Sequence, residues 1–196
     1  NYSIYAESTP NPGVMKFVAN RMLADKSIEI TKAEQAKDIS VAKALFNFPF
    51  VKSLYISSNF ISISKTDNVE WDMIAMQLRN FITDFLNEEG LKNYTENITE
   101  EEIIKKEVSK EKNSKEIEFT DKEKAIIDLL NEYIKPAVEA DGGAITFNSY
   151  VGDVVTVNLK GACSGCPSAT STLKGGIESL LNQKVDPNIV VRANEG

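Results

Sequence analysis

Residues 95–116 constrain the fold of this chain more than any other stretch. They read TENITEEEIIKKEVSKEKNSKE and contain seven Glu and five Lys, but no Gly, Pro or aromatic residue. A segment of this composition cannot bury a core, so it is either a flexible linker or a solvated helix. We interpret it as a charged linker, which leaves two small domains, residues 1–94 and 117–196.

The first of these, residues 1–94, shows both strand and helix patterns. The predicted elements are strands at 2–8 and 14–20, a helix at 41–48, a strand hairpin at 51–64 and a helix at 71–89. The apolar residues of the last helix form one broad stripe, which we expect to face a core. The turn TPNPG between the first two strands is interpreted as rigid, with a docking role left open. The pattern predicts an α+β module.

The pattern of residues 117–196 predicts the order helix, strand, strand, helix, strand. This domain is therefore also expected to be α+β. Thr120 and Glu123 have the spacing of a capping box at the start of the first helix. Pro136 is expected to kink its last turn, and the turn Asp141-Gly142-Gly143 is expected to end it. Two amphipathic helices on one face of a three-stranded sheet would bury one small core. The other sheet face, or an edge, would then be left for a partner.

Charge and residue content exclude several functional classes. The net charge of −7 argues against a nucleic-acid-binding surface. No apolar run approaches the roughly 20 residues that span a bilayer, so we expect no membrane partner. The chain has no histidine, which removes the usual general base near neutral pH and the commonest nitrogen ligand for metals. This agrees with our expectation that the protein is not an enzyme.

Cysteine content bears on the compartment. Two cysteines in 196 residues are too few for a secreted disulfide scaffold. No signal or transit segment is visible either. We therefore expect a reducing intracellular compartment, the cytoplasm.

The two cysteines, Cys163 and Cys166, form a C-x-x-C pair between a predicted strand and a predicted helix. Cys166 stands where that helix should start, with Pro167 at the favoured first position. Thiolates near a helix N-terminus are stabilised by the backbone dipole, as a metal ligand or a nucleophile requires. Gly161 and Gly165 would let the backbone approach a bulky inorganic group, although Gly165 could equally serve only the turn.

Four interpretations of the pair are open. Iron–sulfur clusters and structural zinc sites usually take four protein ligands, and two chains related by a two-fold axis would supply four thiolates. A cluster shared in this way suits a carrier that must give it away. The alternatives are a thiol–disulfide redox module, a zinc-bridged structural dimer and two incidental core thiols.

The residues also carry a family likeness. ADGGAITF, followed by VTVNLKGACSGCPSATSTLKGGIESLL, resembles the C-terminal domain of NifU and of the Nfu-type iron–sulfur carrier proteins. ESTPNPGVMKFVAN and FNFPFVKSLYISSNFISISK resemble the N-terminal domain of the Nfu proteins. The likeness covers both predicted domains and omits mainly the linker.

This resemblance implies a carrier or scaffold in iron–sulfur biogenesis. Such a protein binds a [4Fe–4S] cluster between the C-x-x-C pairs of a homodimer and delivers it to apo-proteins. The family's ligand positions fall on Cys163 and Cys166 of this sequence, and the resemblance assigns no catalytic residue. Apo client proteins and upstream assembly factors are the implied partners, and the first domain is expected to recognise them.

Overall fold

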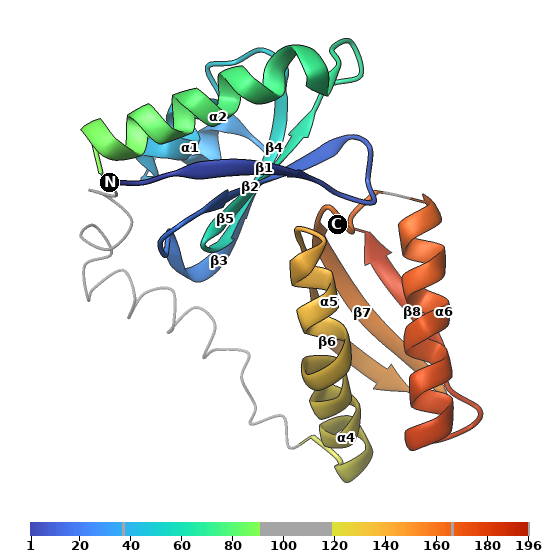
Figure 1. Cartoon of the computed structure of the whole chain (residues 1–196). Coiled ribbons are helices and arrows are strands. Elements are labelled where there is room, and N and C mark those ends of the chain that lie inside the picture. Colours follow the sequence, from blue (N-terminus) through green and yellow to red (C-terminus); the bar gives the residue numbers. More distant parts are fainter. Residues whose placement is uncertain (37, 91–118, 166, 196) are drawn as a thin grey trace.

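A computed structural model describes residues 1–36, 38–90, 119–165 and 167–195 (Figure 1). These residues form two α+β domains, each with its own sheet and its own hydrophobic core. The predicted fold class is therefore confirmed. The predicted linker, 95–116, lies outside the described residues, and so the domain bounds at 94 and 117 stay predictions.

The first domain is built on a five-stranded sheet. Its strands are β1 (Ile4–Ser8), β2 (Val14–Ala19), β3 (Ala24–Ile30), β4 (Val51–Ser58) and β5 (Phe60–Lys65), in the order β1-β2-β5-β4-β3. Every neighbouring pair is antiparallel. The helices α1 (Ser40–Leu45) and α2 (Trp71–Glu88) cover one face of this sheet, and a short 3₁₀ turn, η1 (Ala33–Ala36), precedes α1 (Figure 1).

Helix α2 supplies much of the first core. Its buried side chains are Ile74, Leu78, Ile82 and Leu86. Their spacing of four residues puts them on one stripe of the helix, as predicted. Each fully buried aliphatic side chain of this kind stabilises a fold by about 1.5–3 kcal/mol relative to exposure.

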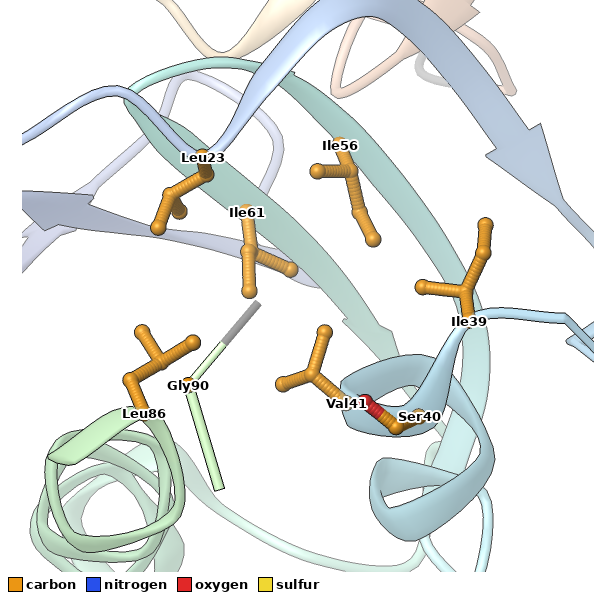
Figure 2. A pocket seen from close by; sticks show the side chains of 8 residues that line it. All are labelled: Leu23, Ile39, Ser40, Val41, Ile56, Ile61, Leu86 and Gly90. Carbon is orange, nitrogen blue, oxygen red and sulfur yellow. The ribbon is translucent and has the colours of Figure 1, made fainter. Parts of the chain in front are cut away.

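A small cavity lies between α1, α2 and the sheet (Figure 2). Its walls are formed by Leu23, Ile39, Ser40, Val41, Ile56, Ile61, Leu86 and Gly90. The cavity measures about 10 Å³ and is largely apolar, which is at or below the space that one water molecule needs. It has no room for a ligand, so a functional site must be sought elsewhere.

The second domain has the predicted order of elements. A long helix comes first, in three parts: α4 (Asp121–Leu129), the π-helical turn η2 (Leu130–Ile134) and α5 (Lys135–Ala140). Then come β6 (Gly143–Val151), β7 (Val154–Gly161), α6 (Pro167–Lys184) and β8 (Val190–Glu195). β6 and β7 are antiparallel, whereas β7 and β8 are parallel. Both long helices lie on one face of the sheet, as expected (Figure 1).

Local signals at the ends of the first long helix are confirmed. The Thr120 side chain accepts a hydrogen bond from the Glu123 N–H, and the Glu123 carboxylate accepts one from the Thr120 N–H. At the other end Gly142 has φ +80°, a left-handed value that favours glycine. The irregularity expected near Pro136 takes the form of the π-turn just before it. Such a turn changes the hydrogen-bond spacing where proline supplies no N–H.

Helix α6 is fastened to the last strand through Glu178. Its carboxylate accepts a hydrogen bond of 2.9 Å from the backbone N–H of Val191, a fully buried residue. We expect Glu178→Ala to lower the free energy of unfolding of this domain by about 1–3 kcal/mol, because it leaves that N–H without its acceptor. Glu178→Gln keeps an accepting oxygen and should cost less. Urea unfolding measures both, and equal losses would contradict this role.

The two domains meet at the sheet face that α1 and α2 leave uncovered. Because side chains alternate across a strand, Phe17 faces the first core while Val18 faces away from it. Val18, Tyr55 and Phe60 are nonetheless buried, with exposed fractions of 6%, 2% and 4%. Ala144 of β6 packs against them. The second domain therefore covers part of this outer face.

Candidate functional site

The loop between β7 and α6 carries the predicted site. Cys163 follows β7, which ends at Gly161, and α6 begins at Pro167. The strand-to-helix setting predicted for the cysteine pair is therefore confirmed. Cys166 itself lies outside the described residues. Residues 162–165 are called the cysteine loop below.

Cys163 is buried, with an exposed fraction of 6%, and it belongs to the second core. Its sulfur lies against the backbone of Gly143, the first residue of β6. A Cβ atom on Gly143 would stand 2.5 Å from the Cys163 Sγ, closer than real side chains approach. Thr170, in the first turns of α6, donates a hydrogen bond of 3.4 Å to the Cys163 carbonyl. The position of this thiol therefore depends on the absence of a side chain at Gly143.

A cleft of about 340 Å³ opens beside Cys163. Its walls are formed by Pro10, Ala137, Val138, Asp141, Ala162, Cys163, Thr172 and Leu173. They come from the end of α5, the start of α6, the cysteine loop and, through Pro10, the first domain. The volume falls within the range of ordinary small-molecule sites, which is about 300–1,000 Å³. A group bound in this cleft would lie next to the cysteine loop.

The first domain contacts the cysteine loop directly. The side-chain amide of Asn11 donates hydrogen bonds to the carbonyl oxygens of Ala162 and Ser164, at 3.1 and 3.5 Å. The Glu29 carboxylate accepts one of 3.1 Å from the Gly161 N–H. A docking role for the TPNPG turn was an open expectation from the sequence, but this contact was not predicted. No local pattern relates positions 11 and 162.

A charge pair of the second domain lies away from this loop. Lys122, in the first turn of α4, and Asp186, after α6, form an ion pair of 2.8 Å. This hydrogen bond raises the pKa of Lys122 above its ordinary value and lowers that of Asp186. The whole length of α6 separates Asp186 from the cysteine loop, so the pair lies at the opposite end of the domain.

Metal-holding clusters and membrane-spanning helices are both absent from the residues that the structure describes. Within them no group of three or more His, Cys, Asp or Glu side chains is placed to hold a metal ion. Nor do their helices include one that is both long and apolar enough to cross a membrane.

Comparison with known families gives a match in each domain. Residues 4–89 match the family described as "Scaffold protein Nfu/NifU N terminal", and residues 126–192 match the "NifU-like domain". Both matches agree with the resemblance drawn from the sequence motifs.

Curated relatives extend over both domains. The proteins named "NFU1 iron-sulfur cluster scaffold homolog, mitochondrial" from Drosophila grimshawi and Drosophila willistoni are each 33% identical over 181 residues. The alignments cover 91% of this chain and 57% and 58% of those proteins. The chain thus spans less than two thirds of the length of these relatives.

Solved structures match over part of the chain. A solution structure of a NifU-like protein from Saccharomyces cerevisiae has 29% identity and a TM-score of 0.40, and covers 43% of this chain and 77% of its own. A solution structure of a Staphylococcus epidermidis protein has 30% identity and a TM-score of 0.31, over 41% and 93% of the two chains.

The expected cytoplasmic location is contradicted by these relatives, which are named as mitochondrial. The physical reason is that a low cysteine content reports a reducing environment only. It does not distinguish between the compartments in which thiols stay reduced.

Proposed function

Because the chain belongs to the Nfu-type family, whose two domains it carries in order, we propose that it is an iron–sulfur cluster scaffold. In this proposal Cys163 and Cys166 bind a [4Fe–4S] cluster as thiolates, and the chain delivers that cluster to apo-proteins. The names of its relatives further lead us to place this activity in mitochondria.

The observation that carries this proposal is the setting of Cys163. The thiol lies at the wall of a cleft of about 340 Å³, in the loop that leads into an 18-residue helix. In the sequence Cys166 directly precedes this helix, and unpaired N–H groups and the helix dipole at such a terminus stabilise thiolate over thiol. The cleft supplies space beside the sulfur, and its walls are mostly apolar, as suits a soft thiolate-bound cluster.

The proposed cluster is shared between two chains. The sequence holds two cysteines and no histidine, whereas a [4Fe–4S] cluster takes four thiolate ligands. A second copy related by a two-fold axis supplies the missing pair. Delivery then proceeds by ligand exchange. A thiolate of the recipient forms a bond to iron as one cysteine sulfur of the scaffold leaves, and no side chain has to act as acid or base.

Native mass spectrometry of the full chain after anaerobic incubation with iron and sulfide tests this proposal. We expect a dimer that carries one [4Fe–4S] cluster. A colourless dimer containing zinc would replace the proposal with a structural zinc site. A bare monomer that reduces insulin disulfides would replace it with a redox module.

A further inference from the structure

The carboxamide of Asn11 joins the two domains in one defined orientation. Its oxygen accepts a hydrogen bond of 3.0 Å from the Gly13 N–H, inside its own loop. Its nitrogen donates to the carbonyls of Ala162 and Ser164. An N–H only donates and a carbonyl only accepts, so these partners fix which end of the amide faces which domain. Asn11 thereby binds the backbone on both sides of Cys163.

The loop that presents Asn11, residues 9–13, is held rigid within the first domain. The Thr9 hydroxyl lies 2.9 Å from the Val14 carbonyl and accepts a hydrogen bond from the Asn11 N–H. The Trp71 indole donates a hydrogen bond of 2.9 Å to the Pro12 carbonyl. Little conformational freedom is therefore lost when this loop meets the cysteine loop, which favours the contact.

Further polar contacts converge on the same end of the second domain. Lys16 donates to the Ala140 carbonyl at 3.1 Å, at the C-terminus of α5, where a positive charge is favourable. Ser62 donates to the Gly142 carbonyl at 2.6 Å and is itself 1% exposed. Both side chains stand on the outer face of the first sheet. That face therefore docks onto the end of the domain that carries Cys163.

We propose that this contact is a closed state of the chain, in which the first domain caps its own cysteine loop. A second chain that brings its cysteines to Cys163 needs the space that Pro10 and Asn11 fill, so the two domains must separate before a cluster can be shared. This inference rests on the proposed function only in its last step. The cap itself is a property of the single chain.

The contact is small enough to open without unfolding either domain. Its buried apolar part consists of Val18, Tyr55 and Phe60 against Ala144, whereas each domain keeps a separate core. Opening would expose these side chains and the Ser62 hydroxyl. The freed sheet face would then be available to other proteins.

The rate at which Cys163 is alkylated tests the cap without any cluster. In full chains that carry Cys166→Ser, Cys163 is the single thiol, and its reaction with iodoacetamide under reducing conditions is followed by mass. We expect Asn11→Asp to speed this reaction about tenfold, the effect of losing roughly two hydrogen bonds. The carboxylate still accepts from Gly13 but faces the carbonyl oxygens of Ala162 and Ser164 with no donor.

Asn20→Asp is the matched control. The Asn20 side chain also bridges an N–H and a carbonyl, those of Ser3 and Asn1, within the first domain alone. Asn20→Asp adds the same negative charge as Asn11→Asp, and the alkylation rate of Cys163 in this variant should stay at the parent value. Ser62→Arg is the second opening variant, because its bulk displaces Gly142 while the first core is untouched. The cap is refuted if neither Asn11→Asp nor Ser62→Arg speeds the reaction while circular dichroism shows both folded.

The rate of cluster loading tests whether the cap must open before a cluster is bound. With both cysteines present, Asn11→Asp should form the cluster-bridged dimer several-fold faster than the parent on incubation with iron and sulfide. If the parent and Asn11→Asp formed the dimer at equal rates although Asn11→Asp is alkylated faster, the cap would stand. The need for the domains to separate before loading would be refuted. A parent that binds no cluster would refute the proposed function, and the alkylation result would still decide whether the cap exists.

Discussion

The variant Cys163→Ser is expected to lose cluster binding almost completely, by more than about a hundredfold. A loss of that size exceeds the 10–100-fold typical of residues that only support metal ligands. A serine hydroxyl is not ionised near neutral pH and is a poor ligand for the soft iron of a cluster. Iron and sulfide content after reconstitution, together with the charge-transfer absorption of the cluster, measures the effect. Cys166→Ser should give the same loss.

Folding must be measured alongside, because Cys163 is 6% exposed and belongs to the second core. A buried hydroxyl in place of the thiol is expected to cost about 1–3 kcal/mol of unfolding free energy. Ser164→Ala is the matched control, since it alters the neighbouring side chain and keeps both thiols. A folded Cys163→Ser chain that retains half of the parent's iron would show that this thiol is not a ligand.

The second large effect is expected from Gly161→Ala, which should destabilise the second domain by about 2–5 kcal/mol. Gly161 has φ +63°, a left-handed value that costs a residue with a Cβ about 1–2 kcal/mol. That Cβ would also lie 2.7 Å from the Gly142 carbonyl oxygen and 3.1 Å from the Tyr55 ring. Overpacking of this kind adds about 1–3 kcal/mol.

Gly152→Ala separates the two causes. Gly152 has φ +62°, and no atom lies within 4 Å of the position that its Cβ would take. This variant should therefore lose only the backbone part, about 1–2 kcal/mol. Thermal or urea unfolding of both variants gives the difference. Equal losses would mean that the close approach at Gly161 carries no energy.

Much of the fold was predictable because its signals are local. The spacing of Ile74, Leu78 and Ile82 marks one face of α2, and Thr120 with Glu123 marks the start of α4. Strand β3 was not predicted, because it lacks such a local signal. Its middle residues are exposed, and a register shift between Ala24 and Ile28 breaks the alternation that identifies a strand.

The contact between the domains could not be predicted, because it joins positions far apart in the sequence. A signal was nevertheless present. Tyr55 and Phe60 are large apolar residues on the strand faces opposite to those that form the first core. Similarly, the place of Cys163 between a strand and a helix was predictable from the sequence, but its burial was not. That burial depends on the close approach of the Gly143 backbone and on the core of the second domain.

The residue after Asn11 affects how long its amide survives. Asparagine ages to aspartate mainly when the nitrogen of the following peptide attacks the side-chain carbonyl carbon, a ring closure that requires the hydrogen on that nitrogen. Here the following residue is Pro12, whose nitrogen carries no hydrogen. The amide is thereby protected from the main route of chemical ageing. The hydrogen bonds that Asn11 makes between the domains are thus protected from slow chemical loss of the amide, because of the residue that follows it in the sequence.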